Sequence, residues 1–189
     1  MTPSTPDVGT VPIDVPVLQD RTALAHLNHP QTDDETTIAV IADPHIATRA
    51  ENTWKQFAQT EQLLERAVEK VRTLDVDGAI VLGDLTKDGE LWNFNRYDAL
   101  IESVSAPMVT IPGNHDVPKG FDTHPGRSPD TFGKRYAQGR YPVLKRLGSI
   151  DVIGLNTASH PEGKLRDSHG GCVSDQQRRE LDQLLSQAT

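Results

Sequence analysis

Four short apolar runs rich in Val and Ile are the feature that most constrains the fold of this chain. They read TIAVIA (37–42), GAIVLG (78–83), PMVTIP (107–112) and IDVIGLN (150–156). Short continuous runs of this composition are typical of strands that are covered on both faces, as in parallel sheets. The sequence therefore predicts four strands, each too short to be a helix of ordinary length.

The segments between these runs have helical periodicity. Between the first two runs, apolar residues recur three or four positions apart: Leu63, Leu64, Ala67, Val68, Val71 and Leu74. Between the second and third runs, the same spacing is formed by Phe94, Tyr97, Ile101 and Val104. A third helix should begin at Ser174, which makes a capping-box pattern with Gln177, and bury Leu181, Leu184 and Leu185. Alternating strands and helices predict an α/β layered fold with largely parallel strands and right-handed crossovers.

Two segments lack such periodicity. Residues 1–35 contain many Pro, Thr and Asp, which predicts a flexible N-terminal arm and leaves residues 36–189 as the domain. Residues 118–146 carry repeated Gly and Pro among charged and aromatic residues. They predict a long loop or irregular insertion, which in compact domains is often functional.

Composition excludes several classes of protein. The formal net charge of −8 offers no broad basic surface, which disfavours nucleic acid as a partner. The one cysteine, Cys172, cannot form a disulfide framework or a thiolate zinc site within the chain. No apolar run approaches the roughly 20 residues that cross a bilayer. We expect a cytoplasmic protein without a membrane association, either ordinarily acidic or from a salt-adapted organism.

Polar side chains follow three of the predicted strands at the point where each strand ends. They are Asp43 and His45, then Asp84, then Asn114 and His115. Because the carboxyl ends of parallel strands meet at one edge of a sheet, we expect these side chains to converge. Carboxylate, imidazole and amide groups suit Mn, Fe, Zn or Ni better than copper. If strand geometry continues past residue 42, Asp43 and His45 point the same way.

The ordered motifs DPH, GDLTKDGE and GNHD resemble the calcineurin-like metallophosphoesterase superfamily, particularly its cyclic-nucleotide-phosphodiesterase-like branch. The resemblance extends from about residue 36 to the C-terminus. It implies a four-layer α-β-β-α sandwich with two divalent metal ions. Matched by position, Asp43 and His45 would hold the first metal, Asp84 would bridge both, and Asn114 would hold the second. His115 would contact the phosphate or the leaving group.

The resemblance also implies a reaction. A metal-activated hydroxide would attack the phosphorus of a phosphomonoester or phosphodiester, and His115 would act as general acid. An acidic side chain should orient His115. Asp88 and Asp116 are the candidates for this role, because Lys87 occupies the position where relatives often carry the carboxylate.

The match to the family pattern stops before its last two elements, a His after a further strand and a Gly-His-x-His motif. We therefore expect a sandwich that is incomplete at its C-terminal side, with an exposed sheet edge that allows self-association. His160 and His169 are interpreted as loop residues, and His124 as a loop residue that could meet substrate. Two functions stay open: a metal-dependent phosphoesterase, or a truncated, non-catalytic remnant or interaction module.

Overall fold

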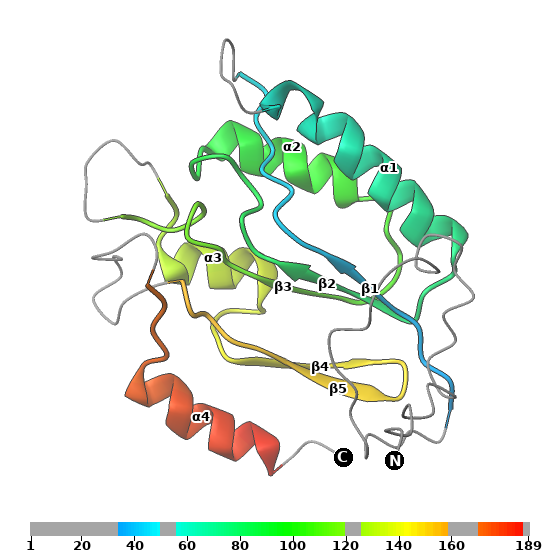
Figure 1. Cartoon of the computed structure of the whole chain (residues 1–189). Coiled ribbons are helices and arrows are strands. Elements are labelled where there is room, and N and C mark those ends of the chain that lie inside the picture. Colours follow the sequence, from blue (N-terminus) through cyan, green and yellow to red (C-terminus); the bar gives the residue numbers. More distant parts are fainter. Residues whose placement is uncertain (1–33, 50–55, 120–125, 159–169, 187–189) are drawn as a thin grey trace, which may run out of the picture.

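The computed structural model describes residues 34–49, 56–119, 126–158 and 170–186 (Figure 1). The flexible arm predicted for residues 1–35 therefore falls almost wholly outside the described residues. The same is true of His124, His160 and His169.

Three parallel strands form the sheet that carries the site. They are β1 (Ile38–Ile41), β2 (Gly78–Leu82) and β3 (Met108–Ile111), in the order β1-β2-β3. Val40 lies opposite Ile80, and Ile80 opposite Val109, so the parallel pairing predicted for these runs is confirmed. The central strand is well covered, with Val81 fully buried. The prediction that both faces of each strand are covered is wrong for β1, where Val40 is 59% exposed.

Two helices cover one face of this sheet (Figure 1). A short 3₁₀ helix, η1 (Phe57–Gln59), leads into α1 (Thr60–Thr73), and α2 (Leu91–Ile101) follows β2. Both α-helices occur where the periodicity predicts them. Buried Leu64 and Phe94 pack with Val81 in the main core. Burial of such apolar side chains is the chief stabilising contribution to a domain of this size.

A hairpin lies on the opposite face of the sheet (Figure 1). It consists of β4 (Val143–Leu147) and β5 (Ile150–Gly154), which pair antiparallel. A Cβ added to Gly78 of β2 would lie 2.7 Å from the Leu147 Cβ, so the two sheets are in close contact. The fourth predicted strand therefore exists, but it does not join the parallel sheet. The turn at Gly148, where φ is 57°, reverses the chain and makes β4 its nearest partner.

A helix interrupts the segment predicted to be a loop. Within residues 118–146, α3 (Pro129–Tyr136) and part of β4 are regular, so that prediction is wrong there. Ser128 caps α3 by accepting a hydrogen bond from Thr131 N, and Pro129 follows it in the first turn. Gly133 indicated a loop in the sequence. In the structure a Cβ at Gly133 would lie 2.8 Å from the Gly139 carbonyl oxygen, so this glycine permits close packing instead.

The last described helix, α4 (Asp175–Leu185), lies beyond the hairpin (Figure 1). Its predicted cap is confirmed, because the Ser174 hydroxyl accepts from Gln177 N at 3.1 Å. Burial of Leu185 is wrong, since this residue is 56% exposed. The mixed α/β class is confirmed, and in space α1 and α2, the parallel sheet, the hairpin and α4 lie one after another (Figure 1). The complete four-layer sandwich stays a prediction.

Gln177 fastens α4 to the end of β5. Its buried side chain accepts from Asn156 N at 2.9 Å and donates to Asn156 O at 2.7 Å. We expect Gln177→Ala to lower the free energy of unfolding by about 1–3 kcal/mol, because both backbone groups of Asn156 lose a buried partner. Denaturant unfolding and amide hydrogen exchange of α4 would measure this.

The matched control for this change is Gln176→Ala, one position earlier in α4. The exposed Gln176 amide bonds to Glu180 on the same helix, so its loss should change stability by no more than about 0.5 kcal/mol. Equal effects of the two substitutions would contradict the fastening role of Gln177.

Candidate metal centre

The loops after β1 and β2 are joined by backbone hydrogen bonds beyond the strands themselves. His45 N donates to Asp84 O at 2.8 Å, and Ile46 N donates to Leu85 O at 2.9 Å. An isolated parallel bridge between Ile46 and Thr86 continues this pairing. The backbone therefore sets His45 directly beside Asp84, as the convergence of strand ends predicts.

Asp43, His45 and Asp84 all have left-handed backbone conformations, with φ of 52°, 43° and 49°. Such conformations are uncommon outside glycine, and they cluster at functional sites. Strand geometry therefore does not continue past β1. The prediction that strand alternation points Asp43 and His45 the same way is wrong. The two side chains still approach each other, with His45 Nε2 4.0 Å from Asp43 Oδ1. Asp43 is the more open, with its side chain 62% exposed.

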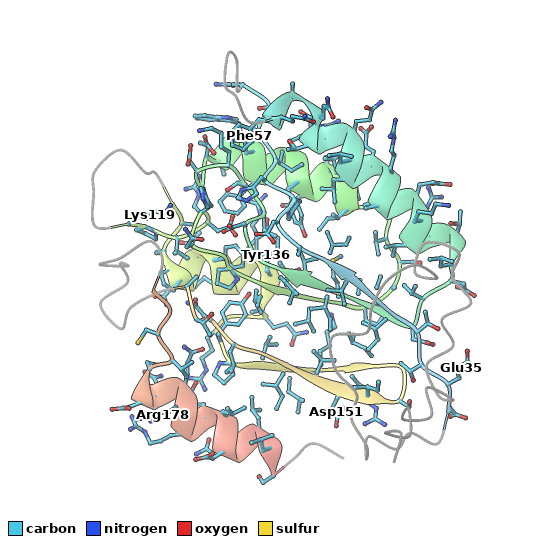
Figure 2. The ribbon with its side chains drawn as sticks, in the orientation of Figure 1. Glu35, Phe57, Lys119, Tyr136, Asp151 and Arg178 are labelled. Atoms are coloured by element: carbon cyan, nitrogen blue, oxygen red, sulfur yellow. The ribbon has the colours of Figure 1, made fainter. Side chains whose placement is uncertain are left out.

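Three side chains gather at this edge of the sheet. One ligand atom from each of His45, Asp84 and His115 lies within 4.8 Å of the others. His45 Nε2 is 3.5 Å from Asp84 Oδ2, and the two imidazole rings meet edge to face with centroids 4.8 Å apart. The ring of Phe57, labelled in Figure 2, lies 6.5 Å from that of His45 and borders the cluster.

The turn after β3 brings the third motif to the same place. His115 N donates to Asp84 Oδ1 at 2.9 Å. A Cβ added to Gly113 would lie 2.0 Å from that oxygen, so only glycine allows the approach. Asn114 lies between Gly113 and His115 in the sequence and is partly buried. The turn therefore brings Asn114 to the same edge as Asp84, and its role as a metal ligand stays a prediction.

Of the two acidic candidates for orienting His115, Asp88 is the one beside the ring. Asp88 Oδ1 lies 3.5 Å from His115 Nδ1, and the backbone carbonyl of Lys87 also contacts that nitrogen. The Lys87 ammonium forms an ion pair with Asp88. Lys87 therefore touches the site through its backbone, although its side chain is not a carboxylate.

Residues 36–188 match the profile of the family described as calcineurin-like phosphoesterase. The chain belongs to this family. Its fold is similar to that of a solved dimetal phosphatase from Danio rerio, with a TM-score of 0.60 and 18% identity over 80% of this chain and 65% of that one. At that identity the likeness shows a shared fold.

Among curated proteins, the chain is 31% identical over 94 residues to the 3',5'-cyclic adenosine monophosphate phosphodiesterase CpdA of Pseudomonas aeruginosa, covering 48% of this chain and 34% of CpdA. It is 25% identical over 118 residues to a probable cyclic nucleotide phosphodiesterase of Vesicomyosocius okutanii, covering 62% of this chain and 44% of that protein. The matches thus span less than half the length of these curated relatives.

The donor set at this edge of the sheet fits a divalent cation. The Asp84 carboxylate and the His45 imidazole are ligand types of Mn, Fe, Zn and Ni, and oxygen donors from Asp43 and Asn114 lie on the adjoining turns. Burial lowers the pKa of His45 below its usual value, against the opposing effect of the neighbouring Asp84 carboxylate. The neutral imidazole favoured by burial is the form that binds a metal.

Asp116 braces the loops after β2 and β3. It is fully buried, and its carboxylate accepts hydrogen bonds from Leu85 N, Thr86 N, Thr86 Oγ1 and Gly113 N at 3.0–3.1 Å. Burial raises the pKa of Asp116 to about 7, whereas the backbone donors act to lower it. The carboxylate thus ties the turn after β2 to the turn after β3.

Two residues of this site carry no clear signal in the sequence. Thr86 looks like an ordinary loop residue, yet it is fully buried and donates to Asp116. Phe57 belongs to no motif, and its place beside His45 depends on the path of the chain before α1.

None of the helices in the described ranges combines the length and hydropathy that a bilayer span requires.

Proposed function

We propose that this chain is a metal-dependent phosphoesterase that hydrolyses a phosphomonoester or a phosphodiester. The observation that carries the proposal is the meeting of His45, Asp84 and His115 within 4.8 Å at the carboxyl ends of three parallel strands. Membership of the calcineurin-like phosphoesterase family supports it, as do relatives named as cyclic nucleotide phosphodiesterases.

The residues take roles that follow from their places. Asp43 and His45 would hold one divalent ion, Asp84 would bridge, and Asn114 would hold a second. Asp84 suits a bridging role because its Oδ2 faces His45 while its Oδ1 faces the turn after β3. When bound, such ions supply a nucleophilic hydroxide at neutral pH and neutralise charge on the phosphoryl oxygens. The ions would be Mn, Fe, Zn or Ni.

His115 would deliver a proton to the departing oxygen. Its Nδ1 contacts the Lys87 carbonyl and faces Asp88, so the proton would leave from Nε2–H of the imidazolium form of the ring, and the neutral ring that results would keep its proton on Nδ1. Proton donation of this kind contributes typically 10²–10⁴-fold to rate. Without it, hydrolysis should become more dependent on the acidity of the leaving group.

A non-catalytic module of the same fold is the second candidate, because the match spans 34–44% of the curated relatives' length. In the described part of the chain, β1 and β3 are the outer strands of their sheet, which leaves room for further strands. Self-association through such an edge and a cytoplasmic location stay predictions, as does the absence of a nucleic-acid partner.

Metal removal and replacement test the proposed function. The purified chain would be stripped with a chelator and reloaded separately with Mn²⁺, Fe²⁺, Zn²⁺ and Ni²⁺, with bound metal counted by elemental analysis. We expect hydrolysis of bis(p-nitrophenyl) phosphate or p-nitrophenyl phosphate to disappear with the metal and return with at least one ion. Buffer containing the same ion without protein is the control. Hydrolysis equal to that control at every ion would reject catalysis and favour the module.

A further inference from the structure

We propose that a cavity between α2 and α3 binds a small oxyanion through the guanidinium groups of Arg127 and Arg135. Both arginines line this cavity, together with the rings of Phe94, Phe132 and Tyr136. Its volume of about 70 Å³ is enough for several water molecules or for one small anion. The cavity lies outside the proposed metal centre, so the inference does not rest on the proposed function.

The first observation is a buried hydrogen-bond donor of Arg127. Its Nε–H group is shielded from solvent, and no acceptor for this group occurs among the described residues. A buried donor without an acceptor costs free energy, and most such groups in folded proteins have a partner. An oxygen atom of an anion in the cavity would be such a partner.

The second observation is an excess of positive charge at the cavity. Arg135 has a counterion, because its Nε donates to Asp98 Oδ2 at 2.7 Å and its Nη2 pairs with the same carboxylate. In the described part of the chain, Arg127 has no carboxylate partner. Two guanidinium groups therefore share one acidic side chain beside a cavity that is partly apolar. Like charges repel more strongly in such surroundings than in water, and an anion between them would relieve the repulsion.

The third observation is the chemistry of the donors. A guanidinium group presents a planar fork of N–H groups that matches two oxygens of a phosphate or a carboxylate. Arg135 is held in place for this purpose, since its Nη2 also donates to Asn95 Oδ1 at 3.1 Å. Its Cζ lies 5.8 Å from the centroid of the Phe94 ring and 5.7 Å from that of Tyr136. The cavity therefore suits an oxyanion of the size of phosphate or acetate.

Arg127 is also connected to the turns that carry the metal centre. Arg127 N donates to Asp116 O at 2.6 Å. A Cβ added to the preceding Gly126 would lie 2.3 Å from the Val117 carbonyl carbon, and one added to Gly89 would lie 2.4 Å from Gly126 Cα. The segment that leads to Arg127 thus packs against the turn after β3 and the loop after β2. An anion held by Arg127 should stabilise both turns.

Titration of the full chain with inorganic phosphate tests the site, after metal has been stripped with a chelator so that phosphate cannot bind to it. Ionic strength would be held constant with sodium chloride. We expect saturable shifts in the ¹H–¹⁵N signal of Arg127 Nε–H and in the ring signals of Phe132, with the Kd measured by calorimetry. A parallel titration with acetate shows whether carboxylates bind as well. Shifts that are absent from Arg127 with both anions, or confined to His115, would overturn the proposal.

Substitution of Arg127 by Gln should weaken phosphate binding by about 10–100-fold, because charge-assisted hydrogen bonds are lost. The matched control is Arg140→Gln, which removes a guanidinium with a 74% exposed side chain that pairs with Glu180 instead of lining the cavity. Its affinity for phosphate should equal that of the wild type. Equal losses in the two variants would indicate general charge attraction and would overturn the proposal. If Arg127→Gln does not fold, the wild-type titration still decides.

Substitution of Asp98 by Asn should strengthen phosphate binding several-fold, because it frees Arg135 from its counterion. Asparagine keeps an oxygen that can accept from the Tyr136 hydroxyl, which donates to Asp98 Oδ1 at 2.7 Å. The same calorimetric titration measures the change. Unchanged or weaker binding in Asp98→Asn would contradict the assignment of Arg135 to the site.

Discussion

Substitution of Asp84 by Asn is expected to remove both metal binding and hydrolysis. Asp84 is 8% exposed, and its two oxygens face His45 Nε2 and His115 N. Asparagine keeps the shape but replaces one carboxylate oxygen with an amide NH₂, so it cannot bridge two cations. Loss of an outer partner of a metal site costs about 10–100-fold. Loss of the bridging ligand itself should cost more than about 100-fold in activity.

The matched control for Asp84→Asn is Asp75→Asn. Asp75 also has a left-handed backbone, with φ of 47° against 49° for Asp84, but it is exposed and lies before β2 rather than after it. Both variants therefore change Asp to Asn at a left-handed backbone position, and they differ only in where the residue lies. We expect Asp75→Asn to keep metal content and activity, measured by elemental analysis and by p-nitrophenyl ester hydrolysis. Metal retained at the wild-type level in Asp84→Asn would contradict the proposed centre.

Substitution of Asp116 by Ala is expected to lower the free energy of unfolding by about 3–5 kcal/mol. The carboxylate accepts from the backbone N–H groups of Leu85, Thr86 and Gly113 and from the Thr86 hydroxyl. All these donors lie in or beside a buried site, and alanine would leave them without their partner. Urea unfolding of the metal-free protein would measure the loss separately from any effect of metal binding.

The comparison variant for this experiment is Glu69→Ala. The Glu69 carboxylate pairs with Arg72 on the surface of α1, with its side chain 63% exposed. Exposed pairs of this type contribute about 0–1 kcal/mol, so little change is expected. If Asp116→Ala cost no more than Glu69→Ala, Asp116 would not be the brace that joins the two turns. Asp116→Asn should fall between them, because its amide oxygen still accepts.

Local patterns in the sequence were sufficient to predict the parallel sheet and the helices on its face. Strand runs such as GAIVLG and the periodic apolar residues of α1 report burial within one short segment, which is why they can be interpreted without the rest of the chain. The convergence of His45, Asp84 and His115 was also predictable. Polar residues at the carboxyl ends of neighbouring parallel strands are brought together by the sheet itself.

Other features depended on contacts between distant segments. The run at 150–156 has strand composition, but its antiparallel partner β4 is selected by the turn at Gly148 and by packing on β2. Gly133 indicated a loop, because sequence alone does not show that Gly139 O lies close enough to require a residue without a side chain. Helix α3, which contains Gly133, was not predicted for the same reason.

The sequence by itself determined the chemistry at the edge of the sheet, since the identity of the carboxylate and imidazole groups and the strands that carry them are local facts. Only the tertiary structure decided where each acidic group lies and what it contacts. Asp88 and Asp116 were equivalent candidates in the sequence, yet one lies 3.5 Å from His115 Nδ1 and the other is buried among backbone donors. The physical reason is that the role of a carboxylate depends on its burial and its nearest donors, which packing between loops sets.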